Sequence, residues 1–362
     1  MSKNTKIYFN IEDDFKKYPQ ATVLVIVGGR GTGKTFSTLQ HCYKSGKKFA
    51  FMKRTDRDVD MMCPLSINAK HDKACIDVSP FKKLNMLNKW NVRAFKVAKG
   101  LGGFWKCTNN NEPVGDPIGY IVSLYSISKL TGADFSDCSY EIFDEFIPRQ
   151  YETTKQTEGE QVIEFYRTIE RSSRIDGGDG VKIILLANSL TVGSPMARTL
   201  EITNDLVDMQ KNNEEIRMLE DRSILIHRLP DIEGFREIEM QDPIYKVMHG
   251  TKWADMSLNN TFAYDDFTYI GKQRMKGMRC IARVHWNNKY FYIYTGENGT
   301  YVTMSKSNNY DFDYDLERDG EQQRFYLEQV FFLREDLQDD RIRFETYELY
   351  DMFINYRKLY KI

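Results

Sequence analysis

The sequence predicts an α/β protein in which the first part of the chain forms a mainly parallel sheet. Short apolar runs occur at ATVLVIV (21–27), KKFAFMKR (47–54), SYEIFDEF (139–146) and VKIILLANS (181–189). Segments with helical apolar spacing separate them, such as QVIEFYRTIERSSR (161–174). Continuous apolar strands that alternate with helices are typical of a parallel sheet covered on both faces.

The composition limits the size and class of the protein. A chain of 362 residues, of which 41% are hydrophobic, predicts one large domain and one smaller domain. Lys plus Arg (51) nearly balance Asp plus Glu (52), so bulk charge gives no argument for binding to nucleic acid or membranes. No apolar stretch approaches the roughly 18 residues that span a bilayer. The start lacks a signal peptide and the six cysteines form no C-x-x-C pair, so we expect reduced thiols in a cytoplasm.

The first apolar run ends in a glycine-rich loop, GGRGTGKT (28–35), which matches G-x-x-x-x-G-K-[ST]. In such a P-loop the backbone N–H groups surround a phosphate, Lys34 reaches the β- and γ-phosphates, and the Thr35 hydroxyl holds Mg²⁺. The next segment, FSTLQHCYKSG (36–46), should form a helix whose N-terminus faces the same anion. An ordinary glycine turn is the alternative. The expected nucleotide contacts are Gly28, Gly29, Arg30, Gly31, Thr32, Gly33, Lys34, Thr35 and Asn188.

Two further strand ends supply polar side chains for the same edge of the sheet. SYEIFDEF ends in Asp144 and Glu145, which has the form of a Walker B motif. Asp144 can bind Mg²⁺ together with Thr35, and Glu145 can orient or deprotonate the attacking water. VKIILLANS ends in Asn188 and Ser189, which could sense the γ-phosphate or could be a plain polar strand cap.

Phosphoryl transfer also needs a cation that faces the transition state. Arg167, Arg171 and Arg174 share one helical segment, where the alternative is a solvated basic face. Arg30 in the P-loop could act within its own subunit, and Lys129 is a third candidate. The sequence does not rank them.

The remaining segments define the predicted domains. Residues 91–125 contain aromatic, β-rich pieces that predict an antiparallel insertion in the first domain, 1–200. A charged stretch that includes a helical pattern at 204–222 predicts a linker or helical subdomain over 201–235. In the last domain, 236–362, MRCIARVHWNNKYFYIYTG (278–296) predicts a hairpin around Asn287-Asn288, YVTMS adds a strand, and the terminal segment 343–362 is helical. We expect the acidic stretch 311–321 to be a solvated loop.

The order of GGRGTGKT, FMKR, YEIFDEF, YRTIERSSR and LLANS resembles the DNA-packaging ATPases of small tailed phages, relatives of terminase large subunits. The looser segment GTKWADMSLNNTF (250–262), followed by a hairpin, is similar to the C-terminal domain of that family. The resemblance implies an additional-strand, conserved-glutamate ATPase that uses ATP and Mg²⁺ to translocate double-stranded DNA. It also implies a homo-oligomeric ring, by resemblance a pentamer, that acts in the host cytoplasm and transiently at the portal vertex of a procapsid but is absent from the mature virion. A structural RNA is a further implied partner, and a membrane is not.

The resemblance also carries roles to individual residues. Lys34 and Thr35 match the phosphate and Mg²⁺ positions, Asp144 and Glu145 match the Walker B pair, and Arg171 matches an arginine finger given to the neighbouring subunit. Lys129 matches a second such residue only approximately. The predicted catalytic residues are therefore Glu145, Arg171 and Lys34, and the metal ligands are Thr35 and Asp144.

The C-terminal domain departs from the nuclease of larger terminases. A ribonuclease-H-type nuclease needs several carboxylates that converge on two metals. Here the hairpin carries no acid before Glu297, and Asp265 and Asp266 lie in a separate segment. We therefore expect a ribonuclease-H-like α+β domain without nuclease activity that docks to portal, DNA or RNA.

Two basic clusters are candidate DNA contacts, because phosphate contacts give sequence-independent binding. A solvated face is the alternative for each cluster. The two clusters comprise Lys53, Arg54 and Arg57, and Lys272, Arg274, Lys276 and Arg279.

Two other functions remain open from the sequence. A helicase-type ATPase or a nucleotide-controlled assembly switch would share the P-loop and Walker B motif.

Overall fold

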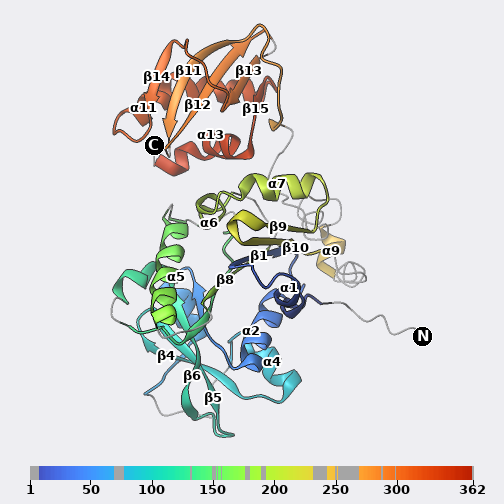
Figure 1. Cartoon of the computed structure of the whole chain (residues 1–362), viewed down its shortest axis with the longest axis vertical. Coiled ribbons are helices and arrows are strands. Elements are labelled where there is room, and N and C mark those ends of the chain that lie inside the picture. Colours follow the sequence, from blue (N-terminus) through green and yellow to red (C-terminus); the bar gives the residue numbers. More distant parts are fainter. Residues whose placement is uncertain are drawn as a thin grey trace, which may run out of the picture. The chain divides into compact units, whose positions relative to one another are not determined.

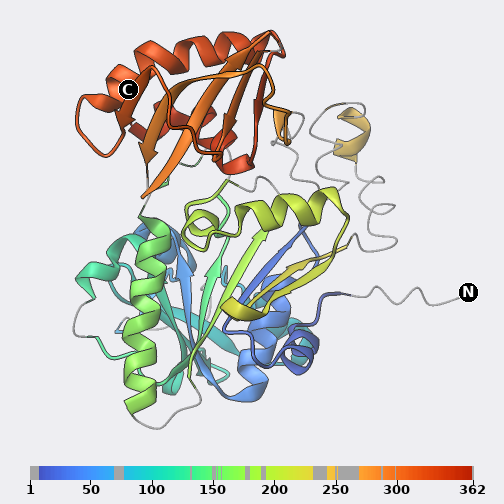
Figure 2. The ribbon, with the colours of Figure 1, turned by 45° about the horizontal axis from the view of Figure 1, so that its top comes forward.

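The computed structural model divides the chain into two compact units (Figures 1 and 2). The larger unit comprises Met1–Leu200 and Asp208–Ala263, and the smaller comprises Glu201–Val207 and Tyr264–Ile362. The structure describes residues 8–68, 77–130, 133–148, 152, 154–155, 157–175, 180–188, 193–230, 243–248, 251, 269–286, 288–297 and 299–360. In these ranges no helix combines the length and the apolar character that crossing a bilayer requires.

The larger unit is built on a ten-stranded sheet in which six adjacent strands, from β6 to β10, run parallel, which confirms the predicted mainly parallel sheet. The strand order is β3-β4-β5-β6-β2-β7-β8-β1-β10-β9. The strands are β1 (Val23–Gly28), β2 (Lys48–Lys53), β3 (Leu65–Ser66), β4 (Val92–Ala98), β5 (Leu101–Cys107), β6 (Pro113–Ser123), β7 (Cys138–Asp144), β8 (Lys182–Asn188), β9 (Ile216–Leu219) and β10 (Ile224–Arg228).

Helices cover both faces of this sheet (Figure 1). Leu39 and Cys42 of α2 pack with Ile142 of β7, while the buried Val162 and Phe165 of α5 belong to the opposite face. The helices are α1 (Ile11–Lys17), α2 (Lys34–Ser45), α3 (Asp56–Met62), α4 (Phe81–Asn88), η1 (Leu124–Lys129), α5 (Glu158–Ile175), α6 (Pro195–Thr199), α7 (Thr203–Lys211), η2 (Glu220–Arg222) and α9 (Pro243–Val247).

The strand order brings the predicted site residues to one edge of the sheet. β8 lies between β1 and β7, and the register pairs Gly28 with Asn188 and Asp144 with Leu186. All six residues of β1 are buried, as expected for a central parallel strand. The P-loop, the Walker B end and Asn188 therefore leave neighbouring strands at the same edge.

The antiparallel insertion predicted for residues 91–125 is present, because β4, β5 and β6 form an antiparallel meander at one side of the sheet. Within the segment predicted as a linker or helical subdomain, 201–235, the described part (201–230) begins with the helix α7 and continues with the strands β9 and β10. β10 pairs with β1, and β9 pairs antiparallel with β10. β9 is only four residues long and therefore leaves little apolar periodicity in the sequence. β10 joins the sheet by pairing with β1, which is distant from it in sequence.

The smaller unit has a five-stranded sheet in the order β14-β11-β12-β13-β15. The expected hairpin and third strand are present as β11, β12 and β13, and the acidic stretch expected to be a loop contains β14. The elements are β11 (Arg279–Trp286), β12 (Lys289–Gly296), β13 (Gly299–Thr303), β14 (Phe312–Asp315), α11 (Glu321–Phe325), a π-helical turn (Tyr326–Val330), α12 (Phe331–Gln338), β15 (Ile342–Phe344) and α13 (Tyr347–Tyr360).

One buried acid lies in the centre of the large sheet. Glu141 of β7 is fully buried, and neither of its carboxyl oxygens has a hydrogen-bond partner among the described residues. Its side chain faces away from the α2 side, since Tyr140 and Ile142 belong to that core. Burial raises the pKa of Glu141 well above its ordinary value. The carboxyl group is therefore held neutral in the folded protein.

We expect Glu141→Gln to stabilise the protein increasingly as pH rises. The raised pKa means that the wild-type contribution is complete below the unfolded pKa of about 4.3. It is lost at about 1.4 kcal/mol per pH unit as pH rises toward the folded pKa. Urea unfolding of both proteins at several pH values measures the difference. A stability difference that does not change with pH would contradict the neutral, buried carboxyl.

Candidate nucleotide-binding site

The P-loop places Lys34 in the centre of the site. Gly31 and Gly33 have φ angles of 76° and 91°, which glycine adopts without the strain that a Cβ would add. Lys34 Nζ lies 2.9 Å from Gly28 O, 2.7 Å from Gly29 O and 3.4 Å from Asn188 Oδ1. Burial lowers the pKa of Lys34 to about 8. The ammonium is therefore held inside the loop, where a phosphate would meet it.

The Walker B carboxylate meets the end of the P-loop. Thr35 Oγ1 donates to Asp144 Oδ1 at 3.0 Å, and the two side chains come from α2 and β7. Hydroxyl and carboxylate oxygens are the ligands that Mg²⁺ prefers. Lys53 Nζ, at the end of β2, lies 2.7 Å from Asp144 Oδ2 and 3.7 Å from Glu145 Oε2. Although burial acts to lower it, these two carboxylates raise the pKa of Lys53 above its ordinary value.

The backbone of Glu145 is in the left-handed region, with a φ of 62°. Such a conformation in a residue other than glycine costs on the order of 1–3 kcal/mol, so the surroundings must enforce it. Arg54 Nη2 donates to the carbonyl oxygens of Glu145 at 3.1 Å and Phe146 at 3.3 Å. Arg54 Nε contacts both carboxylate oxygens of Glu158, at 2.9 and 3.1 Å, and its Nη1 lies 3.1 Å from Glu152 Oε2.

This network is buried. Arg54 is 8% exposed and Glu158, at the start of α5, is 1% exposed. The guanidinium therefore joins the Walker B turn to the first residue of α5. The sequence predicted Arg54 as a DNA contact and gave no sign of its pairing with Glu158, because the two residues are 104 positions apart.

A pocket of 270 Å³ is lined by the end of the P-loop together with Asp144 and Glu145. Asn188 lines it beside the P-loop, and its amide oxygen faces Lys34. Lys83 of α4 and Phe36 of α2 also line it, and neither is among the site residues predicted from the sequence. Lys83 had no signal in the sequence, because its position follows from the packing of α4 against α2. The lining residues are Gly31, Thr32, Gly33, Lys34, Thr35, Phe36, Lys83, Asp144, Glu145, Ala187 and Asn188.

The other predicted cations lie elsewhere. Arg30 is exposed and does not line the pocket, and Lys129 is exposed at the end of η1. Arg167 and Arg171 are exposed on α5, where they line a separate open pocket with Glu164, Thr168 and Glu170. Arg174 pairs with Glu170. Within one chain, the structure does not bring Arg171 to the nucleotide pocket. Ser189 lies outside the described residues.

The predicted DNA contacts divide into paired and exposed residues. Lys53 and Arg54 are engaged with acids inside the larger unit, as described above, and Arg279 Nη2 lies 2.7 Å from Asp311 Oδ2. Arg279 is nevertheless exposed, as are Arg57 in the larger unit and Lys272, Arg274 and Lys276 in the smaller one.

In the smaller unit, basic side chains of β11 pair with acidic side chains in and next to β14. Arg279 pairs with Asp311, Arg283 with Asp313 at 2.5 Å, and His285 with Asp315 at 3.0 Å. These pairs explain why the acidic stretch forms a strand rather than a solvated loop. Asp265, Asp266 and the segment 252–268 lie outside the described residues, as does Asn287.

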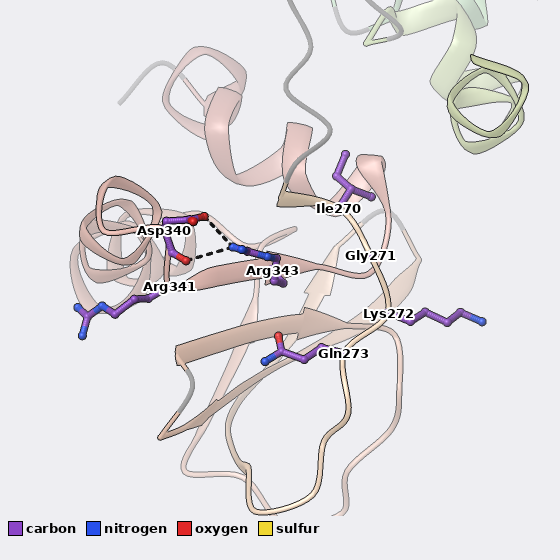
Figure 3. A pocket seen from close by; sticks show the side chains of 7 residues that line it. All are labelled: Ile270, Gly271, Lys272, Gln273, Asp340, Arg341 and Arg343. Atoms are coloured by element: carbon purple, nitrogen blue, oxygen red, sulfur yellow. Dashed lines mark hydrogen bonds and ion pairs between the residues drawn. The ribbon is translucent and has the colours of Figure 1, made fainter. Parts of the chain in front are cut away.

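A second pocket, of 330 Å³, lies between the segment before β11 and the start of β15. Figure 3 shows Arg343 bonded to Asp340 beside Gln273, while Lys272 extends away from them. Arg341 pairs with Asp336 and Asp339, so the basic side chains here are largely neutralised. The lining residues are Ile270, Gly271, Lys272, Gln273, Asp340, Arg341 and Arg343.

The sequence pattern of the podovirus DNA encapsidation protein (Gp16) family matches residues 114–324, which is more than half of the chain. The chain belongs to this family. The resemblance to phage packaging proteins that the motifs predicted is thereby confirmed, and DNA encapsidation is the function of this family member.

Two solved structures resemble the encapsidation protein over almost its whole length. The Phi-28 gp11 DNA packaging motor has a TM-score of 0.60 at 15% identity, covering 98% of both chains. The bacteriophage Phi-29 viral genome packaging motor assembly has a TM-score of 0.63 at 16% identity, covering 96% of this chain and 99% of its own. At such identities the likeness establishes a shared fold. No curated protein matches the chain.

Proposed function

We propose that this encapsidation protein is an ATP-hydrolysing motor that translocates double-stranded DNA into a procapsid. The observation that carries the proposal is the convergence of Lys34, Thr35, Asp144 and Glu145 around one pocket. These residues come from the loops after β1 and β7, two strands that flank β8 at the same edge of the sheet, and their types are those that phosphoryl transfer requires. Family membership favours this function over a helicase or an assembly switch.

The geometry supports a division of roles among the pocket residues. Lys34 would bind the β- and γ-phosphates, while Thr35 and Asp144 would hold Mg²⁺, whose charge would stabilise the phosphate oxygens. Glu145 would orient the attacking water and accept its proton. Asn188, whose amide oxygen lies 3.4 Å from Lys34 Nζ, would sense the γ-phosphate. The remaining P-loop residues, from Gly28 to Gly33, would supply backbone contacts.

Glu145→Gln should preserve Mg-ATP binding, because the P-loop and Asp144 remain, while hydrolysis falls by orders of magnitude. Lys34→Ala should instead weaken nucleotide binding itself. Calorimetric titration with ATP and measurement of phosphate release separate the two effects. Packaging of DNA into purified procapsids should occur with the wild type and fail with Glu145→Gln. Wild-type turnover by Glu145→Gln would remove that residue from its role.

We infer that the active form is a homo-oligomeric ring in the host cytoplasm that docks transiently at the procapsid portal and is absent from the mature virion. The exposure of Arg171 on α5, outside the pocket of its own chain, supports a finger that reaches a neighbour's nucleotide. The fold shared with packaging motors supports the ring, for which five subunits and an RNA partner are the finer proposals.

Arg171→Ala should bind ATP normally but hydrolyse it roughly 10³–10⁵-fold more slowly, because the transition state loses its cation. Mixing it with Glu145→Gln subunits, which are also inactive, should restore part of the activity. Some interfaces would then combine an intact Glu145 with an intact Arg171. Mixed oligomers that show no activity at any ratio would favour a cation within the same chain, such as Arg30.

We infer that the smaller unit is a ribonuclease-H-like docking domain without nuclease activity. The described acids of β14 are paired with basic side chains of β11, which leaves them unlike a two-metal site. We also keep as a proposal that the functional domains divide at about residues 200 and 235. DNA phosphates would contact the exposed Arg57, Lys272, Arg274 and Lys276, with Lys53, Arg54 and Arg279 contributing only after leaving their acidic partners.

Plasmid DNA incubated with the protein and Mg²⁺ or Mn²⁺ should remain uncut, and affinity for duplexes of unrelated sequence should fall linearly with salt on a log–log plot. Gel electrophoresis and fluorescence anisotropy measure the two outcomes. Robust cleavage would show that the smaller unit is a nuclease. Affinity that is insensitive to salt would contradict binding through phosphates.

A further inference from the structure

Lys83 is held at the nucleotide pocket by a firmly anchored helix. Phe81 and Leu84 of α4 are fully buried, so the helix cannot rotate without exposing apolar side chains. Asn85 fixes the helix to β4, because its side-chain amide donates to Val92 O at 2.8 Å and accepts from Val92 N at 3.0 Å. The position of Lys83 is therefore set by the fold rather than by a mobile loop.

The side chain of Lys83 lies beside the end of the P-loop. It lines the same pocket as Lys34, Thr35 and Asp144, and its Nζ lies 6.0 Å from the centre of the Phe36 ring. Among the described residues, no carboxylate lies within 4.0 Å of this ammonium group. Lys83 therefore presents its charge to the pocket with no acidic partner in the described part of the chain.

The charges in the pocket favour an anionic ligand at Lys83. Lys53 already faces both Asp144 and Glu145, and Lys34 is bonded to backbone carbonyl oxygens of the loop. A nucleotide brings several negative charges, and a lysine ammonium binds phosphate as a flexible point charge. Arg30, the cation that the sequence suggested for the same subunit, does not line the pocket.

We propose that Lys83 binds the phosphate chain of the nucleotide held by its own subunit. This inference rests on the proposed ATPase function and adds to it a cation from α4, outside the P-loop. Its task differs from that assigned to Arg171, because it acts within one chain and in nucleotide binding.

The test compares Lys83→Met with Lys82→Met in the full-length protein. Lys82 is the adjacent residue of α4 and is also exposed, but it does not line the pocket, so it is a matched control for charge and helix context. Titration calorimetry with Mg-ATP should show affinity about tenfold weaker for Lys83→Met, unchanged for Lys82→Met, and largely kept in Lys83→Arg. The deficit should shrink as salt is added, because a lost charge contact is screened.

Thermal unfolding without nucleotide should give the same midpoint for all variants. Wild-type affinity in Lys83→Met, or an equal loss in Lys82→Met, would overturn the assignment. The assignment would also be overturned if Lys83→Met alone bound ATP normally but bound duplex DNA more weakly, because Lys83 would then contact DNA rather than the nucleotide. If the wild type itself binds no ATP, the proposed ATPase function fails, whereas binding that depends on Lys34 but not on Lys83 rejects only the present inference.

Discussion

The candidate site depends on the guanidinium group of Arg54. It holds two carbonyl oxygens of the turn after β7 and binds Glu158 at the start of α5. Both charges are buried, and burial is tolerable only because each finds a partner at hydrogen-bond distance. The left-handed backbone of Glu145 is thereby tied to the helix that carries Arg171. A change at α5 and a change at the Walker B turn therefore act on the same ion pair.

Internal pairing of charges is a second theme of the protein. The chain has nearly equal numbers of acidic and basic residues, and the structure uses many of them against one another. Lys53 faces both Asp144 and Glu145, and Arg279, Arg283 and His285 pair with acids in and next to β14. Partners distant in sequence thus removed several cations from the predicted DNA surface. Arg57 and Lys276 are exposed to solvent, so their charges do not need an acidic partner.

Local patterns identified the parts of the site that chemistry confines to short segments. The P-loop requires glycines and Lys-Thr at fixed spacing, and buried strands that end in acids or Asn need only a few residues to be recognised. Patterns failed where pairing was non-local. β10 lay in a segment taken for a linker because its partner β1 is distant in sequence, and β9 joins the sheet only by pairing with β10. Lys83 reaches the pocket only through the packing of α4 on α2.

The sequence by itself determined the fold class of the larger unit, and it predicted the candidate phosphate-binding loop and the candidate Walker B acids, because apolar periodicity and loop chemistry are written in consecutive residues. Only the tertiary structure decided which charges are free. It placed Arg54 in the interior, left Arg171 on the surface, and turned Lys83 toward the P-loop. The physical reason is that the electrostatic role of a side chain depends on burial and on partners that the fold, rather than the neighbouring sequence, brings within a few ångströms.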